Sequence, residues 1–184
     1  MSLSINDIIE LLCEETRRYS LFINYPDPKI TNEKIKYFLA ILIVSRYDKK
    51  PSKKSYWDSG EDLHNTAVYN SMRRDRFIQI MRFMHCADNN NLDTKDKMTN
   101  LRPLITKIKE TFFLVNYIPG QEIIYHKSMI KYFGKHGCKQ YIHGKPIHFR
   151  YKVWCINSKS RYLINFEIYQ GYIPNSVEEE EEIR

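Results

Sequence analysis

The spacing of apolar residues changes once along this chain, near Pro119 and Gly120, and that change limits what the chain can fold into. Before this point, apolar residues recur at intervals of three and four, which is the pattern of helices that bury one face. After it, apolar and polar residues alternate in stretches rich in aromatic and β-branched side chains, as is typical of strands. The change therefore predicts an α+β protein, with a helical amino-terminal region followed by a sheet.

Four helices are predicted in the first region, at about residues 5–18, from residue 32 onward, and over residues 71–85 and 101–115. The prolines between residues 25 and 28 prevent the first two helices from being continuous. The side chains expected to be buried are Ile35, Phe38, Leu39, Leu42 and Ile43 of the second helix, Phe77, Ile80, Met81 and Met84 of the third, and Leu101, Leu104, Ile105, Ile108, Phe112 and Val115 of the fourth.

Three strands are predicted after Gly120, at residues 122–126, 149–156 and 162–169. The turn at residues 157–160 joins the last two strands into an antiparallel hairpin. Both faces of a sheet need covering, and three strands cannot supply that cover alone. The sequence is therefore expected to stop partway through a larger domain.

Three segments are expected from these patterns and from charge. Residues 1–118 form the helical region, residues 119–171 hold the strands, and residues 172–184 form an acidic, disordered tail. The tail contains five consecutive glutamates, so it masks a stronger basic bias in the rest of the chain. The whole chain has a net charge of +7, whereas residues 1–171 hold 28 basic and 17 acidic residues, a net charge of +11.

The basic residues are densest between residues 126 and 152, a segment with no acidic residue and several interleaved aromatic residues. This combination is typical of a surface that binds a polyanion, so non-specific contact with DNA is predicted. The residues expected to contact nucleic acid are Lys131, Lys135, Lys139, Lys145, Arg150 and Lys152, together with Arg73 and Arg74 of the third helix. The alternative is a solvated basic face, with some of the helix arginines paired to Asp75 or to glutamates.

Several classes of protein are disfavoured by what the sequence contains. The longest apolar run has seven residues, at 38–44, whereas a membrane-spanning helix needs roughly 20. The four cysteines are scattered and form no CxxC pair, which favours an intracellular protein without a disulfide framework. No nucleotide-binding glycine motif occurs, and neither a membrane nor a small-molecule substrate is expected as a partner. The histidines at 126, 136, 143 and 148, with Cys138, match no common zinc spacing, and Cys138 with His136 lacks an orienting residue for nucleophilic catalysis.

A set of short motifs occurs in order along the chain between about residues 31 and 171. The motifs are Tyr56-Trp57, Arg74-Asp75-Arg76-Phe77, Arg82-Phe83-Met84-His85, Ser128-Met129-Ile130, Gly144-Lys145-Pro146, Tyr151-Lys152-Val153-Trp154 and Phe166-Glu167-Ile168-Tyr169-Gln170-Gly171. Together they resemble the amino-terminal half of a piggyBac-type transposase. The resemblance implies a helical dimerisation and DNA-binding region, followed by the first three strands of an incomplete ribonuclease-H-like catalytic domain. It also implies a nuclear location, which the basic run at residues 49–54 is compatible with.

The resemblance implies a reaction that this chain is not expected to perform. The family cuts and joins DNA with three aspartates that hold two Mg²⁺ ions, and carboxylates suit these hard cations. The first aspartate belongs to an Asp-Glu pair just before Ser128, where this chain has His126 and Lys127. Imidazole is a poor Mg²⁺ ligand, and Lys127 is expected to place a positive charge beside the metals. The other two aspartates would lie beyond Gly171, so no enzyme activity and no metal cofactor are predicted.

The leading hypothesis is a transposase-derived protein without catalysis that binds DNA non-specifically, associates with itself, or associates with a related full-length transposase. A second hypothesis is a protein-protein interaction module, because an incomplete sheet exposes strand edges and apolar surface. A third is a truncated gene product with no selected function.

Overall fold

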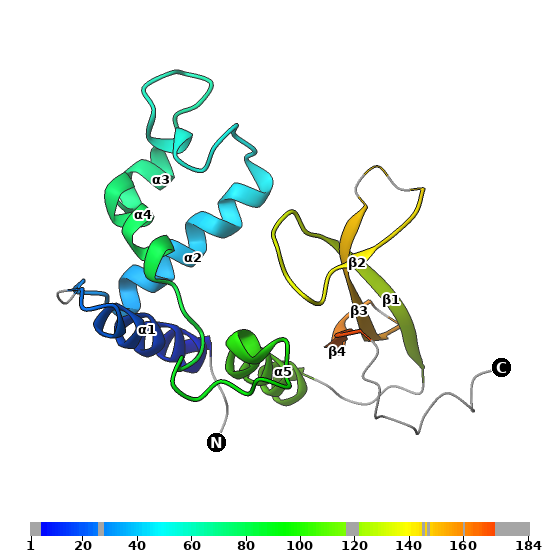
Figure 1. Cartoon of the computed structure of the whole chain (residues 1–184). Coiled ribbons are helices and arrows are strands. Elements are labelled where there is room, and N and C mark those ends of the chain that lie inside the picture. The colour runs from blue at the N-terminus through cyan, green and yellow to red at the C-terminus, as the bar shows by residue number, and fades with distance from the viewer. Residues whose placement is uncertain are drawn as a thin grey trace. The chain divides into compact units, whose positions relative to one another are not determined.

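The computed structural model of the chain describes residues 5–25, 28–116, 122–144, 146, 148–159 and 161–171, with only the backbone described at 112–116. The buried positions predicted at Phe112 and Val115 therefore lie outside the described side chains. One compact unit combines residues 1–93 with 99–111, and a second combines residues 94–98 with 112–184. We call them the helical unit and the sheet unit, after the elements that Figure 1 shows in each. Within the described residues, no helix has both the length and the apolar character needed to cross a membrane.

The helical unit is built around a single apolar core. Its elements are α1 (Ile5–Phe22), α2 (Asn32–Tyr47), α3 (Thr66–Ser71), α4 (Arg74–Phe83), the larger part of α5 (Arg102–Asn116), and short 3₁₀ helices at Ser55–Trp57 and Thr99–Leu101. Helices α1, α2 and α4 contact one another around this core. The buried ring of Phe77 lies near its centre, 5.1 Å from the ring of Phe38 and 5.3 Å from that of Trp57. The helices supply one face each to this core.

Small polar side chains determine where two of these helices begin. The hydroxyl of Thr31 accepts a hydrogen bond from the Lys34 backbone N–H at 3.4 Å, at the start of α2. The side-chain oxygen of Asn65 accepts from the Val68 N–H at 3.0 Å, at the start of α3. Each cap satisfies a backbone N–H that has no partner inside the helix. The Asn65 amide also donates to the Asp48 carboxylate at 2.9 Å and so links α3 to the end of α2.

The helix predicted at about residues 71–85 is present as the shorter α4, which begins only at Arg74 because the chain is extended at Met72 and Arg73 after α3. Met72 is buried, and the indole N–H of Trp57 donates to its carbonyl oxygen at 2.7 Å. This tertiary hydrogen bond replaces the one that a continuous helix would have made at that carbonyl.

Three side chains predicted to be buried are instead exposed. Ile43 is 62% exposed, Met81 is 40% exposed and Leu101 is 41% exposed. Ile41 and Phe83 are buried instead. Helix α2 has apolar residues around most of its circumference, so periodicity alone does not select its inner face.

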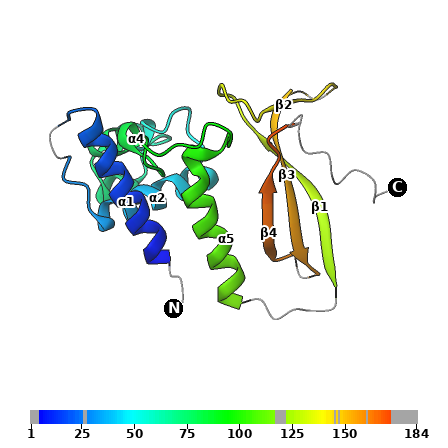
Figure 2. The same cartoon turned by 60° about the horizontal axis from the view of Figure 1, so that its bottom comes forward.

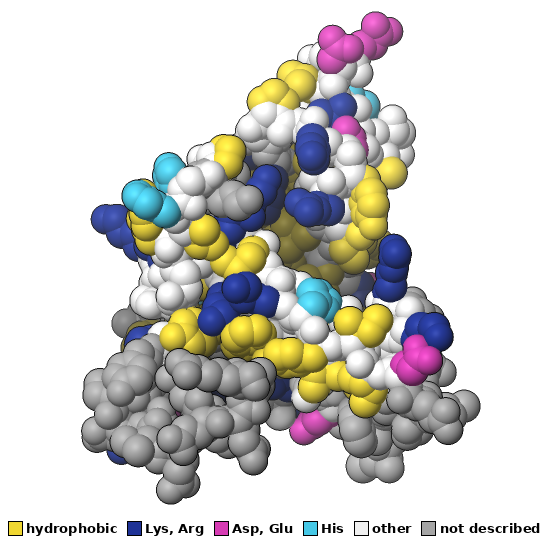
Figure 3. All heavy atoms as spheres, turned by 90° about the vertical axis from the view of Figure 1, so that its right-hand side faces the viewer, with side chains coloured by type: hydrophobic (Ala, Val, Ile, Leu, Met, Phe, Trp, Pro, Cys, Tyr) yellow, Lys and Arg dark blue, Asp and Glu magenta, His cyan; other side chains and the backbone are white. Residues whose placement is uncertain are grey.

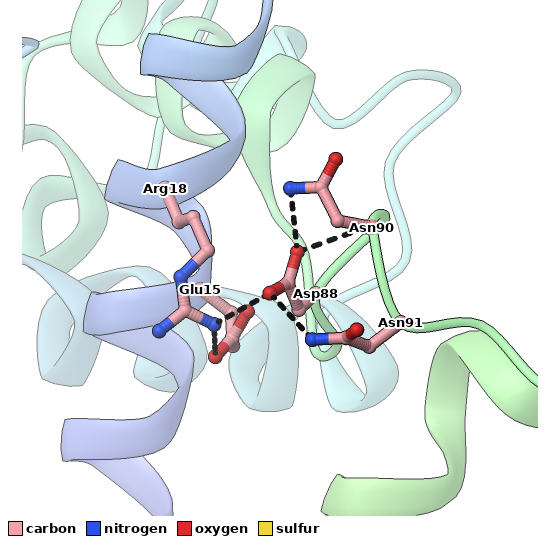
Figure 4. A network of polar contacts seen from close by, with 5 residues as sticks. All are labelled: Glu15, Arg18, Asp88, Asn90 and Asn91. Atoms are coloured by element: carbon pink, nitrogen blue, oxygen red, sulfur yellow. Dashed lines mark hydrogen bonds and ion pairs between the residues drawn. The ribbon is translucent and has the colours of Figure 1, made fainter.

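Polar contacts attach the chain after α4 to α1 (Figure 4). The Asp88 carboxylate accepts hydrogen bonds from the backbone and side chain of Asn90, at 2.9 and 3.1 Å, and from the Asn91 side chain at 3.3 Å. The Arg18 guanidinium lies 3.7 Å from the same carboxylate and also pairs with Glu15 on its own helix. Asp88 therefore organises a local turn and holds it against α1.

The sheet unit is an antiparallel sheet of β1 (Ile123–Lys131), β2 (Gln140–Tyr141), β3 (Phe149–Ser158) and β4 (Leu163–Ile168). Strand β3 lies between β1 and β4, as Figure 2 shows. The short strand β2 lies on the same side of β3 as β4, but it pairs with the first residues of β3, Phe149 and Arg150. The predicted α+β class and the hairpin of the last two strands are confirmed. The first strand continues to Lys131, beyond its predicted end at residue 126, and β2 was not predicted.

Candidate nucleic-acid interface

The strand register divides the basic segment between the two faces of the sheet. Lys127 pairs with Trp154, Met129 with Lys152, and Lys131 with Arg150 across β1 and β3. Directly opposed residues of antiparallel strands point to the same side, and alternate residues share a face. One face, here called the cationic face, therefore carries Tyr125, Lys127, Met129, Lys131, Arg150, Lys152 and Trp154, with Glu167 and Tyr169 from the β4 side.

The opposite face of the strands, here called the histidine face, is the one that packs. It carries His126, Ser128, Tyr151, Val153 and Cys155. Val153 and Cys155 are buried, whereas Lys152 and Trp154 beside them in the sequence are only partly so. The sheet thus buries side chains on one face and leaves the other more open.

Aromatic rings and a lysine form a continuous row on the cationic face. The Lys152 ammonium lies 4.4 Å from the ring centroids of both Trp154 and Tyr169. The Tyr125 ring also stacks on the Trp154 ring, with 5.4 Å between the centroids and an interplanar angle of 13°. We call Tyr169, Lys152, Trp154 and Tyr125 the aromatic row. Cation–π attraction and ring stacking hold Lys152 and Trp154 in place within it.

Charge on this face is mostly positive. Lys127 and Lys131 are exposed on β1, and Arg150 lies directly opposite Lys131 on β3. Glu167 is the acidic residue of the face, and it lies opposite Trp154 on the β4 side. The positive charge is therefore concentrated toward β1.

Three of the predicted lysines, Lys135, Lys139 and Lys145, belong to the segment between β1 and β3 and not to the paired residues of these two strands. Lys135 is exposed. The Lys139 ammonium donates to the Gly134 carbonyl at 3.1 Å and lies 4.2 Å from the centre of the Phe149 ring, on the histidine face. Lys145 lies outside the described residues. The sequence run from 126 to 152 is thus not one continuous surface.

Two of the aromatic residues interleaved in the basic segment pack locally on the histidine face. The rings of Tyr132 and Tyr151 lie 4.6 Å apart, and the His136 ring meets Tyr151 edge-on at 5.5 Å. The buried Cys138 lies beside them, and its backbone N–H donates to His136 Nδ1 at 3.2 Å. Burial, followed by the Tyr132 hydroxyl, raises the pKa of the Tyr151 phenol well above its ordinary value. These rings support the fold of the segment.

His126 lies on the opposite face of β1 from the positive side chain of Lys127. Its ring lies on the histidine face, with Nε2 3.0 Å from the Ser128 hydroxyl and Nδ1 3.5 Å from the Asn157 amide nitrogen. Lys127 lies on the opposite face of the strand, directly across from Trp154. Among the described residues, no group of three His, Cys, Asp or Glu side chains is placed to hold a metal ion. The side chains described next to His126 are a hydroxyl and an amide.

Arg73 and Arg74, which were also predicted to contact nucleic acid, belong to the helical unit. Both are exposed at the start of α4, and Arg74 lies 3.6 Å from the Asp75 carboxylate, as the alternative of local ion pairing anticipated. Arg73 also lines a cavity of about 660 Å³ with Lys34, Tyr37 and Arg76. Arg76 there donates to the Pro28 and Lys29 carbonyls, so it has a structural role.

The space-filling view in Figure 3 shows Lys and Arg side chains lying among hydrophobic ones, with few acidic side chains between them. Sequence reasoning found Lys131, Arg150 and Lys152 of the cationic face but missed the role of Lys127 and of the rings of Tyr125, Trp154 and Tyr169. The alternation of strand residues was the available signal, but it places these rings together only once the register of β1, β3 and β4 is known.

Comparisons with known proteins show which family this chain belongs to. The family model described as Transposase IS4 matches residues 3–183. The chain is 43% identical over 152 residues to PiggyBac transposable element-derived protein 3 of Homo sapiens, covering 82% of this chain and 25% of that protein. It is 37% identical over 164 residues to PiggyBac transposable element-derived protein 2 of Homo sapiens, covering 89% of this chain and 27% of that protein. The chain thus spans about a quarter of the length of these curated relatives.

A solved structure has the same fold. It is a piggyBac transposase in a synaptic complex with hairpin DNA, determined by cryo-electron microscopy. The match has a TM-score of 0.78 at 19% identity and covers 95% of this chain and 38% of that one. It extends through the helices and the strands, which supports the assignment of β1, β3 and β4 to a ribonuclease-H-like sheet.

Proposed function

The chain belongs to the Transposase IS4 family, among the relatives of piggyBac transposable element-derived proteins, and from this premise we propose that it binds DNA without cutting it. Binding is non-specific and uses the cationic face of the sheet unit. The observation that carries the proposal is the register that brings Lys127, Lys131, Arg150 and Lys152 to one face.

The spacing of these cations suits a phosphate backbone. Lys127 and Lys131 are four residues apart on one strand, a separation of about 13 Å, and Arg150 and Lys152 face β1 from the neighbouring strand. Such an array can contact several phosphates at once. Each contact releases counterions, which gives affinity without sequence preference and makes it depend on salt.

The absence of cutting is proposed from the surroundings of His126. The position that the family resemblance assigns to a metal-binding aspartate carries an imidazole whose neighbours are a hydroxyl and an amide. Neither neighbour supplies the negative charge that balances a pair of divalent cations. The protein is therefore proposed to retain the fold of a transposase without its strand-transfer chemistry, and no metal cofactor is proposed.

Salt-dependent binding of a fluorescent 20-base-pair duplex tests the DNA-binding proposal. The double variant Lys127→Gln with Lys131→Gln is expected to bind about 10-fold or more weakly at low salt. The slope of log affinity against log salt should fall by about 1.8, or 0.9 for each lost contact. The matched control is Lys36→Gln with Lys49→Gln, which removes the same charge from exposed positions of the helical unit. The proposal fails if neither duplex nor single-stranded DNA is bound at low salt, or if the control variant loses as much affinity.

A plasmid-nicking assay with Mg²⁺ or Mn²⁺ tests the proposed lack of catalysis. Supercoiled plasmid should remain intact. Cleavage that His126→Ala abolishes would show that this position supports catalysis and would overturn that part of the proposal.

A second candidate function is self-association or association with a related transposase. Ile124 and Ile130 on the histidine face of β1 are exposed, as is Phe133 just after that strand. Exposed apolar residues in number mark a surface that a partner can cover. Size-exclusion chromatography with light scattering should then detect a dimer or larger species. A well-behaved monomer over the accessible concentration range would count against this candidate.

A further inference from the structure

The aromatic row on the cationic face has one end that nothing in the described structure caps. The Lys152 ammonium lies 4.4 Å from the ring centroids of both Tyr169 and Trp154, and the Tyr125 ring stacks on that of Trp154. Tyr125 itself is 58% exposed. The row therefore ends in an accessible phenol ring, with its plane already set by stacking on the indole.

We propose that the cationic face binds single-stranded DNA in preference to duplex DNA, with a nucleobase stacking at the Tyr125 end of the aromatic row. This inference rests on the proposed DNA-binding function and names its preferred substrate. An unpaired base has a free ring face to add to the row. In a duplex the bases are stacked on one another, so only the phosphates remain for the lysines.

The charges around the row indicate the course of the strand. Lys127 lies directly opposite Trp154 and next to Tyr125 on the same face of β1, and Lys131 continues the positive charge along that strand. Glu167 lies on the opposite side of Trp154, where it repels phosphate. A DNA strand is therefore expected to follow β1, with its phosphates at Lys127 and Lys131 and its base at Tyr125.

The packing of the sheet agrees with an open recognition face. The buried side chains Val153 and Cys155 lie on the histidine face. The aromatic row is on the other face, so it does not pack with them. A row of rings next to cations on an accessible sheet is the arrangement that stacks bases in single-strand-binding domains. A lysine held close to two rings also loses little freedom when it binds a phosphate, because it is already ordered.

The test compares three labelled DNA probes by fluorescence anisotropy at low salt, using the full chain. The probes are a 12-residue oligothymidine, a 12-base-pair duplex and a 12-residue abasic strand with the same phosphates. Oligothymidine is expected to bind about 10-fold more tightly than the abasic strand, and more tightly than the duplex. This comparison uses the unaltered protein, so it does not depend on the folding of a variant.

Variants then locate the contact. Tyr125→Ala is expected to weaken oligothymidine binding about 10-fold, to leave duplex binding within 2-fold, and to be rescued by Tyr125→Phe. The control Tyr47→Ala removes a tyrosine of the helical unit that is 83% exposed, against 58% for Tyr125, and should change neither affinity.

The possible failures are distinguishable. Equal affinity for oligothymidine and the abasic strand, duplex binding as tight as single-strand binding, or a Tyr125→Ala variant without effect would overturn this inference alone. Tighter binding of a 12-residue oligouridine RNA would overturn the assignment to DNA. If no probe is bound at low salt, the inference and the proposed function both fail.

Discussion

The two units of this protein differ in how much of their apolar surface is buried. The helical unit collects its apolar side chains into one core, in which Ile30, Ile35 and Ile80 are fully buried. In the described part of the sheet unit, few apolar side chains are buried, and Phe133 is 83% exposed. Each helix has one buried stripe to cover, whereas a sheet has two faces. The helical unit is therefore expected to contribute most of the stability, and the sheet unit most of the accessible surface for recognition.

The largest expected effect is on the core of the helical unit. Phe77→Ala should lower the free energy of unfolding by about 3–5 kcal/mol, because the ring is buried against Phe38 and Trp57. Urea unfolding followed by far-ultraviolet circular dichroism measures the loss. Phe77→Leu is the control, since it keeps most of the apolar volume and should cost less. A loss below about 1 kcal/mol would contradict the comparison between the units.

The second effect is on the reactivity of Cys86, which packs against the same core. Burial, assisted by the charge of Glu15, raises the pKa of this thiol from 9.0 to about 11. Its thiolate fraction near pH 8 should therefore be about 100-fold below that of an ordinary cysteine, and alkylation correspondingly slow. Peptide mass spectrometry after iodoacetamide treatment at several pH values measures the rate.

The same shift predicts a pH dependence of stability. A folded pKa above the unfolded value means that the folded state retains its proton to higher pH. The contribution of Cys86 to stability is fully present below the unfolded pKa and is lost as pH rises through about 11. Urea-unfolded protein should be alkylated at the ordinary rate, and equal rates in the folded and unfolded protein would contradict this account.

A smaller effect is expected at the start of α2. Thr31→Ala removes the acceptor for the Lys34 N–H and should cost about 1 kcal/mol. Thr31→Ser keeps the hydroxyl and should cost much less. Thermal unfolding of the two variants measures the difference, and an equal loss in both would show that the cap is not the cause.

The smallest effect is expected in the sheet unit. Phe133→Ser should change the free energy of unfolding by less than about 0.5 kcal/mol, because its ring is almost fully exposed. Val153→Ala, at a buried position of the same unit, should cost about 2 kcal/mol. If Phe133→Ser instead destabilises the protein strongly, the exposed ring is covered in solution, and the contrast between the units is weaker than described.

The elements were largely predictable because each depends on local pattern. The helices near α1, α2, α4 and α5 and the hairpin of β3 and β4 follow from periodicity, and Thr31 marks the start of α2. The break at Met72 was not predictable, because it depends on an indole N–H from Trp57, 15 residues away. The exposure of Ile43 was missed for a related reason: apolar residues around α2 offered more than one possible inner face.

The candidate site shows the same division. Lys131, Arg150 and Lys152 were predicted from charge alone, and the structure brings them to one face. Lys139 was grouped with them by sequence but folds against Phe149 on the histidine face. Tyr125, Trp154 and Tyr169 were missed, because rings on three different segments meet only through strand pairing.

The amino-acid sequence by itself determined the α+β class, the excess of positive charge and the imidazole at position 126. These depend on residue type and on near-neighbour spacing, which no folding event alters. Only the tertiary structure decided that Lys127 lies directly opposite Trp154 and that Lys152 lies close to two rings. Strand register sets these relations, because a shift of one residue would exchange the two faces.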